Sequence, residues 1–339
     1  MKSDPSVASL SASRKINQLN FALPIFCESS QGFANAWHCS IPTFALIATL
    51  KCVTCERRTL NEVNMSYVTP AEFSAQMVDA GAKKALMSTK DTLIRSYMAG
   101  AILALAAAFA VTVSVQTGHF IIGALLFPVG FCTLYLLGYD LLTGVFTLVP
   151  LAVIDKRPGV DAKAMWRNWG LVFVGNFAGA MTTAVFITIT LTMGFTQPPN
   201  AIGDALMNIG HNRTVGYAEA GAGGMLTLFV RAVMCNWMVS TGVVAAMMST
   251  SVPGKVIAMW MPILIFFYMG FEHSIVNMFL FPIGILLGAD FTWGDYLLYN
   301  EIPTVIGNLV GGLTFVGAML YSTYYKPSSS RVPAQAPAE

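Results

Sequence analysis

The most regular feature of this chain is a series of apolar segments separated by short polar stretches. Each segment is at least as long as the ~20 apolar residues that a helix needs to cross a bilayer. There are six of them, at residues 95–117, 120–154, 165–195, 223–250, 255–288 and 300–325. The pattern therefore predicts an all-α membrane protein with six transmembrane helices.

Two of the segments, 120–154 and 255–288, are too long to be single straight spans. The first carries Gly138 and Asp140 in its middle, and the second carries Gly270, Glu272 and His273. Irregular backbone at membrane depth is tolerated only where protein or a water-filled cavity surrounds it. We therefore expect spans 2 and 5 to be broken at these points, with both breaks lining one cavity.

The two halves of this series repeat each other. At an offset of 132 residues, Gly138-Tyr-Asp recurs as Gly270-Phe-Glu, Pro150 as Pro282, Gly175-Asn176 as Gly307-Asn308, and Gly179 as Gly311. A unit of three spans that is used twice must be inserted upside down the second time, as in many transport proteins. The sequence thus predicts two inverted three-helix repeats whose broken helices face each other near the bilayer midplane.

Composition and charge agree with membrane insertion. Hydrophobic residues make up 55% of the chain and charged residues 11%, with a mean hydropathy of +0.63. The net charge of +2 is not gathered into a basic face, so no nucleic-acid partner is expected. From Met65 onward, Arg213 is the one cation in the outer loops. Eleven lysines and arginines lie in the alternate loops and at the two ends of the transmembrane domain: Lys83, Lys84, Lys90, Arg95, Lys156, Arg157, Lys163, Arg167, Lys255, Lys326 and Arg331. Because positively charged loops stay on the cytoplasmic side, both termini are predicted to be cytoplasmic.

The ends of the chain differ from its apolar centre. Residues 1–64 have no sustained period, and we expect a disordered or non-native extension, with the functional protein starting near Met65. Thr69 followed by Pro70 is a typical helix start. The predicted organisation is an extension at 1–64, a transmembrane domain at 65–326 and a disordered cytoplasmic tail at 327–339.

The six cysteines do not point to a cofactor. Cys52 and Cys55, with His38 and Cys39 nearby, have the spacing of half a zinc site, but no second ligand pair follows at regular spacing. Cys132 and Cys235 stand alone in apolar segments and are expected to pack there. The methionines at 234, 238, 247 and 248 are likewise expected to pack between helices or protomers. We expect neither a metal nor a cofactor.

The two predicted breaks carry the candidate chemistry. The ends of half-helices leave backbone N–H groups unpaired and supply partial positive charge, which suits a small anion. Thr143 offers a hydroxyl at the first break, and His273 is the only histidine within a span. Asp140 and Glu272 hold equivalent positions in the repeat, where they support the breaks and can cap half-helix N-termini rather than meet substrate. The plainer alternative for His273 is a buried side chain bonded to a backbone carbonyl.

Four motifs in a fixed order resemble the formate/nitrite transporter family. They are Gly138-Tyr-Asp-Leu-Leu-Thr-Gly144, Gly175-Asn-Phe-Ala-Gly179, Cys235-Asn-Trp-Met-Val239 and Gly270-Phe-Glu-His-Ser-Ile-Val-Asn-Met-Phe, and the resemblance runs from about Thr69 to Tyr325. It implies an aquaporin-like fold, a homopentamer with one pore per protomer and a place in a lipid bilayer, expected to be a bacterial inner membrane. The implied substrates are small monovalent anions: formate, nitrite, bicarbonate or hydrosulfide.

The resemblance also implies roles for single residues. His273 and Thr143 are the central pair, Asn236 is the polar group near the cytoplasmic slit or the central chamber, and Gly138 and Gly270 support the breaks. Phe127 and Phe266 correspond to the outer constriction, and the inner one corresponds to Phe131, Leu141, Leu142 and Val239.

The chain departs from the family pattern in several places. Tyr139 replaces a small residue, Leu142 a Phe and Ser240 a Cys. The vestibule lysine of the family would fall at Ala220. Attraction of anions to the outer mouth then depends on His211, Arg213, Arg231 or helix dipoles.

Two modes of transport fit these residues. A weak-acid anion takes a proton from or through His273 and crosses as the neutral acid, or it passes a neutral His273 as in a channel. A water or neutral-solute channel would share the fold, but it would carry paired Asn-Pro-Ala motifs at its half-helices, and this sequence has none. An enzyme or haem subunit would need more than one histidine within the spans. A cation transporter would use Asp140 and Glu272, and this alternative stays open.

Overall fold

The computed structural model describes residues 67–325, all of which lie in the compact unit Asn64–Glu339. In this part of the chain the secondary structure is helical, apart from one isolated antiparallel bridge between Tyr67 and Ser249. The expectations for residues 1–64, for the cysteine and histidine group at 38–55 and for the tail at 327–339 lie outside the described residues.

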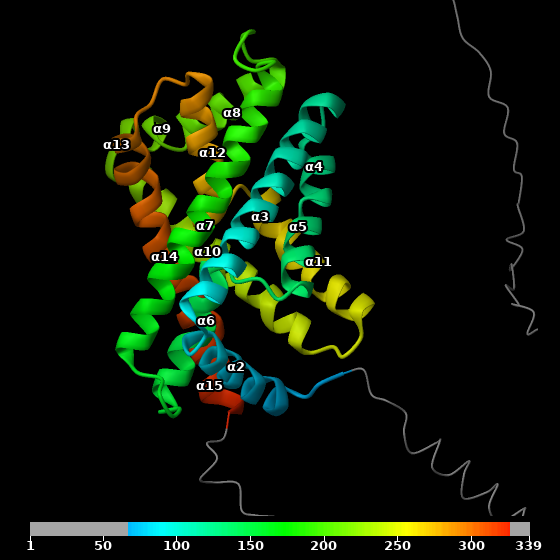
Figure 1. Ribbon diagram of the computed structural model, residues 1–339, viewed down its shortest axis with the longest axis vertical. Coiled ribbons are helices and arrows are strands. Elements are labelled where there is room, and N and C mark those ends of the chain that lie inside the picture. Colours follow the sequence, from blue (N-terminus) through cyan, green and yellow to red (C-terminus); the bar gives the residue numbers. More distant parts are fainter. Residues whose placement is uncertain (1–66, 326–339) are drawn as a thin grey trace, which may run out of the picture. The chain divides into compact units, whose positions relative to one another are not determined.

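The six predicted spans are present as single helices or as runs of consecutive shorter helices (Figure 1). Three are continuous: α3 (Thr89–Thr117), α7 (Ala162–Leu191) and α10 (Gly221–Met247). The sixth runs from Trp293 to Tyr324 as α13 (Trp293–Tyr296), η1 (Leu297–Glu301), α14 (Ile302–Gly312), η2 (Leu313–Ala318) and α15 (Met319–Tyr324). It begins seven residues earlier than its apolar pattern predicts, because Thr292 caps α13 by accepting from Asp295 N–H.

Spans 2 and 5 are broken, as predicted. Span 2 consists of α4 (Phe120–Leu126), α5 (Pro128–Leu136) and α6 (Leu142–Ile154), and span 5 of α11 (Val252–Tyr268) and α12 (Ser274–Leu287). Span 2 has an additional irregularity at Phe127, where Pro128 starts α5.

Within residues 67–325, three further helices lie outside the spans. They are α2 (Pro70–Ala85), α8 (Ala201–Asn212) and α9 (Val215–Glu219). Helix α2 lies with α15 at one end of the bundle, and α8, α9 and α13 lie at the other (Figure 1). As predicted, α2 has Thr69 as its N-cap and Pro70 in its first turn. The backbone N–H of Thr69 donates to the Glu72 carboxylate at 3.0 Å, which lowers the pKa of Glu72.

The helices that precede the two breaks, α5 and α11, end in the same backbone motif. Gly138 and Gly270 follow the last residues of α5 and α11 with φ of +71° and +65°, in the left-handed region that glycine adopts without steric cost. In each case the glycine N–H and the next N–H donate back into the helix, the pattern of a Schellman motif: Gly138 to Tyr135, Tyr139 to Leu134, Gly270 to Phe267 and Phe271 to Phe266. Both motifs follow the 132-residue offset.

The repeat extends to the packing of the long helices. A Cβ on Gly179 would lie 1.9 Å from the carbonyl oxygen of Tyr97 in α3, and one on Gly311 would lie 2.1 Å from that of Val233 in α10. The glycines therefore let α7 approach α3, and α14 approach α10, at backbone contact. These two pairs of closely packed helices hold the broken spans between them.

Candidate anion site between the two half-helices

His273 and Thr143 meet in the interior of the molecule. The Nε2 atom of His273 lies 3.4 Å from Oγ1 of Thr143, and both side chains are buried. His273 is the N-cap residue of α12, and Thr143 lies in the first turn of α6. The structure thus brings together the two residues named for the centre of the pathway, at the start of each second half-helix.

His273 is held in one orientation by its own helix. Its Nδ1 accepts the backbone N–H of Val276 at 3.2 Å, and its ring stacks on that of Phe266 with centroids 5.4 Å apart. A neutral imidazole that accepts at Nδ1 carries its hydrogen on Nε2. The neutral ring therefore presents an N–H donor to the gap shared with Thr143, which differs from the plainer alternative of a bond to a backbone carbonyl.

Two buried asparagines anchor the half-helices in the same way. Asn176 Oδ1 accepts from Leu142 N–H at 3.0 Å, and its Nδ2 donates to the carbonyl of Asp140 at 2.9 Å. Asn308 repeats this arrangement with Ser274 N–H at 3.0 Å and the carbonyl of Glu272 at 2.9 Å. Each asparagine therefore ties together the two sides of one break.

The next N–H group in each half-helix is left free. Within residues 67–325, the structure records no acceptor for the backbone N–H of Thr143 or for that of Ile275, its counterpart 132 residues later. Groups of this kind at a helix N-terminus bind anions, because the N–H and the helix dipole both favour negative charge. The two breaks together can offer these N–H groups, the Thr143 hydroxyl and the His273 ring to one small anion.

Asn236 lies beside this gap but is fully engaged. Its Nδ2 donates to the carbonyl of Thr143 at 3.2 Å and to that of Asn308 at 2.6 Å, while its Oδ1 accepts from Ser240 Oγ at 3.1 Å. Ser240 also contacts Thr147 Oγ1 at 2.5 Å. Asn236 thus joins the two repeats and keeps no N–H group for a passing ligand.

Aromatic rings cover one side of the gap. Phe127 and Phe266 are buried and meet edge to face, with centroids 5.6 Å apart. Phe267, which the sequence did not single out, stacks on Phe127 at 3.9 Å. Because Phe266 also stacks on His273, this aromatic layer lies directly against the central pair.

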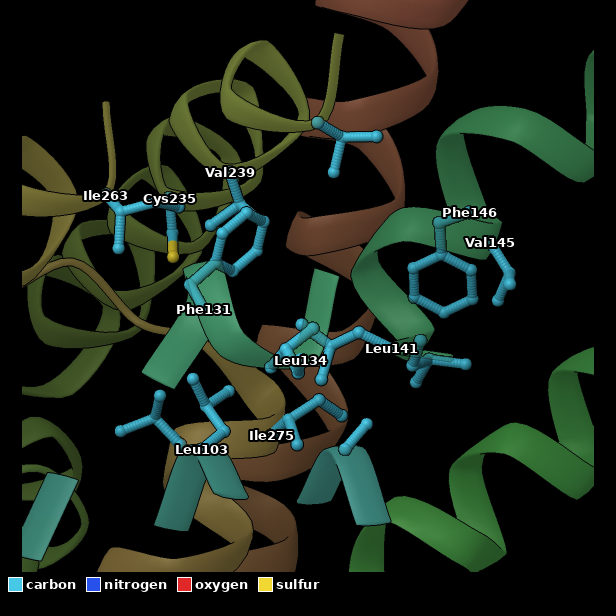
Figure 2. Packing of buried hydrophobic residues seen from close by; sticks show 14 of the residues in the cluster. Leu103, Phe131, Leu134, Leu141, Val145, Phe146, Cys235, Val239, Ile263 and Ile275 are labelled. Atoms are coloured by element: carbon cyan, nitrogen blue, oxygen red, sulfur yellow. The ribbon is translucent and has the colours of Figure 1, made fainter. Parts of the chain in front are cut away.

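Aliphatic side chains and Phe131 close another side. Phe131, Leu141, Leu142 and Val239 are all buried, and Figure 2 shows Phe131, Leu141 and Val239 among the packed apolar side chains. A cavity of about 280 Å³ lies against this layer, toward α2. Its lining includes Phe131, Leu141 and Tyr139 together with Lys84, Gly138, Gly144 and Met247. Tyr139, which replaces a small residue of the family pattern, therefore contributes to the lining of this cavity.

The buried carboxylates do not cap the half-helices, and that expectation was wrong. The N-cap residues are Leu141 and His273, and the carboxylate one residue earlier in each break turns toward a cation on another segment. Asp140, which is fully buried, forms an ion pair with Lys84 of α2. This partner was missed because 56 residues separate it from Asp140 and no local pattern connects them.

Glu272 has a larger set of partners. Arg213 Nε lies 3.6 Å from Oε1, and Tyr217 donates to Oε1 at 2.9 Å while also accepting from Arg231 at 2.8 Å. Asn277 and Asn300 donate to Oε2 at 3.0 and 3.1 Å. Arg213 and Arg231 thus supply positive charge near the second break. His211 instead contacts the carbonyl of Asp290, and Ala220 lies between α9 and α10.

Two cysteines, Cys132 and Cys235, lie in the part of the chain that the structure describes. Cys132 and Cys235 are free and buried, as expected for side chains that only pack. Within the described residues, no three histidine, cysteine or acidic side chains are arranged to hold a metal ion.

Comparisons with known proteins were made with the whole chain. The family profile described as formate/nitrite transporter matches residues 71–322. The chain is 34% identical to a probable formate transporter of Methanothermobacter thermautotrophicus over 250 residues, which are 69% of this chain and 89% of the relative. It is 29% identical to a formate channel of Bacillus thuringiensis, covering 78% and 99% of the two chains. A solved pentameric formate channel with formate bound superposes with a TM-score of 0.58 at 25% identity, covering 72% and 99%.

Proposed function

The chain belongs to the formate/nitrite transporter family of membrane channels, and we propose that its central gap passes formate or nitrite. It is an anion channel, not an enzyme. Bicarbonate and hydrosulfide are the alternative substrates, since both are small monovalent anions. The proposal concerns which anion passes, which residues it meets and whether a proton travels with it.

The observation that carries the proposal is the meeting of two half-helix N-termini at His273 and Thr143. Nε2 and Oγ1 are 3.4 Å apart, and the N–H groups of Thr143 and Ile275 lie in the same first turns. A planar or linear anion can accept hydrogen bonds from several of these donors at once. Apolar layers at Phe127 and Phe266 and at Phe131, Leu141, Leu142 and Val239 make the charged form costly elsewhere along the path.

A proton can lower that cost at the centre. A neutral His273 donates a hydrogen bond from Nε2 to the anion. In the proton-coupled mode His273 takes up a proton from the aqueous side at Nδ1, which breaks the hydrogen bond from Val276 N–H, and gives its Nε2 proton to the anion. The neutral acid then crosses the apolar layers, and the ring returns to its starting form by losing the Nδ1 proton to water and regaining one at Nε2. Without this transfer the anion passes as in a channel.

The assembly and orientation are also proposed. We infer a homopentamer in a bacterial inner membrane, with one pore in each protomer and both termini in the cytoplasm. Large exposed hydrophobic side chains on α3, α7 and α11, such as Phe109, Phe186 and Ile257, suit contact with lipid or with a neighbouring copy. The cavity against Lys84 would then face the cytoplasm, and the Arg213 side of Glu272 would face outward.

Uptake into liposomes that contain the purified protein tests the proposal. Formate, nitrite, bicarbonate, hydrosulfide and water are compared at an acidic and a neutral pH. We expect formate or nitrite to pass fastest and the Thr143→Val variant to lose roughly tenfold or more, since a hydrogen bond to a charged group contributes about 1.5–3 kcal/mol. Thr190→Val, an exposed position on α7, is the matched control and should keep the wild-type rate. Equal rates for Thr143→Val and wild type would contradict the proposed site.

A further inference from the structure

Besides Asp140 and Glu272, a third carboxyl group is buried close to the start of α12. Glu301, the last residue of η1, is 2% exposed. Its Oε1 accepts from Ser274 Oγ at 2.5 Å, and its Oε2 accepts from Tyr296 OH at 2.9 Å. Ser274 is the first residue of α12 and follows His273 directly. Glu301 therefore contacts the residue that joins the pore histidine to its half-helix.

Glu301 differs from the other buried carboxylates in having no cation. Asp140 pairs with Lys84 and Glu272 with Arg213, but among residues 67–325 no lysine, arginine or histidine forms an ion pair with Glu301. An ionised carboxylate that lacks such a partner is strongly disfavoured at membrane depth. A carboxylic acid avoids this cost, and it keeps both contacts because it can donate one hydrogen bond and accept another.

The groups that surround Glu301 do not supply the missing charge. From the break before α12 come Glu272 and His273, and Glu272 accepts from Asn300, the neighbour of Glu301. From α13 comes Tyr296, and from the α8–α9 region come Arg213 and Tyr217, which are both engaged with Glu272. Arg213 is thus already paired with Glu272, and a second negative charge on Glu301 would repel the charge on Glu272.

We propose that Glu301 is a further positioning residue of the pore, which carries a proton in the conducting state and through Ser274 fixes the start of α12. Two groups of the sixth span hold Ser274: the Asn308 amide at its backbone N–H and Glu301 at its hydroxyl. When Glu301 loses its proton, its carboxylate carries a negative charge in contact with Ser274, the residue that follows His273. This charge repels an anion in the gap. Flux then falls at alkaline pH for a reason independent of the substrate.

The test rests on the proposed anion conduction and uses exchange of radiolabelled formate in liposomes at equal internal and external pH. Glu301→Gln keeps both hydrogen bonds and cannot ionise. The ratio of its rate to that of wild type should be near unity at acidic pH. It should rise about tenfold at alkaline pH, which corresponds to about 1.4 kcal/mol. Glu219→Gln, an exposed carboxylate of α9, should give a ratio that does not change with pH. A constant ratio for Glu301→Gln would overturn the proposal.

Two further readouts cover a variant that does not fold and a channel that does not carry formate. Tyr296→Phe keeps the carboxyl but removes a hydrogen bond that stabilises its ionised form, so the alkaline decline should move to higher pH; an unmoved decline would count against the role of Glu301.

Infrared spectra report the protonation of the carboxyl group without any measurement of transport. Wild type should show a protonated carboxyl band at neutral pH that Glu301→Gln lacks, and identical spectra would overturn the proposal even if no formate passes.

Discussion

At the scale of single residues, the pore is built around two asparagines that hold broken backbone in place. Asn176 and Asn308 each satisfy a half-helix N–H, the carbonyl on the other side of the break and a carbonyl of the neighbouring long helix: Ser96 at 2.7 Å for Asn176 and Ala232 at 2.8 Å for Asn308. Buried backbone groups need such partners because no water replaces them at membrane depth. The free N–H groups of Thr143 and Ile275 are thus left beside anchored neighbours.

Replacing Asn308 by Ala should therefore destabilise the protein. The change leaves the Ser274 N–H and the carbonyls of Glu272 and Ala232 without their partner, which we expect to cost about 2–4 kcal/mol. Thermal unfolding of the protein in detergent, followed by tryptophan fluorescence, measures the loss. Asn212→Ala, at the exposed end of α8, should change the free energy of unfolding by less than about 0.5 kcal/mol. Equal stability of the two variants would mean that Asn308 does not anchor the break.

The residues of the site were only partly predictable. The approach of His273 to Thr143 follows from the repeat, because both lie at equivalent breaks. The partners of Asp140 and Glu272 do not follow from it, since Lys84 and Arg213 belong to segments outside the repeat. A carboxylate next to a helix start is a plausible cap, but here the imidazole of His273 takes that position and the carboxylates turn toward cations instead.

At the scale of elements, glycines do two different things, and substitution separates them. Gly138 permits a left-handed turn, and no atom lies within 4 Å of the place that a Cβ would take there, so Ala should cost about 1–2 kcal/mol through backbone strain alone. Gly311 lies against the Val233 carbonyl, so Ala must push α14 away from α10, at about 3 kcal/mol or more. The same unfolding assay compares the two variants. A larger loss for Gly138→Ala than for Gly311→Ala would contradict this division.

The elements themselves could largely be read from hydropathy. Six apolar segments became six spans, and the two overlong ones are broken at the glycines that the repeat identified. Helices α8 and α9 were not predicted, because they are shorter than a span and lie in a connection that hydropathy treats as a loop. Glu301 escaped notice for a related reason: it lies at a π-helical turn near the start of the sixth span, and its contact with Ser274 joins it to a distant segment of the chain.

At the scale of the whole molecule, the repeat places two half-helix N-termini on opposite sides of one gap. Neither break alone surrounds an anion, because α6 supplies Thr143 and α12 supplies His273. Asn236 connects the two by donating to carbonyls of both repeats. The central claim is that this shared gap binds the anion, and that His273 decides whether a proton travels with it.

Formate uptake into liposomes, recorded together with the internal pH, tests this claim most directly in the His273→Phe variant. Phe keeps the ring that stacks on Phe266 but removes the donor and the titratable group. His119→Phe, at an exposed position before α4, is the matched control. We predict that His273→Phe abolishes the acid-stimulated, proton-coupled part of uptake while His119→Phe retains it. Acid-stimulated uptake by His273→Phe at the wild-type rate would contradict the account.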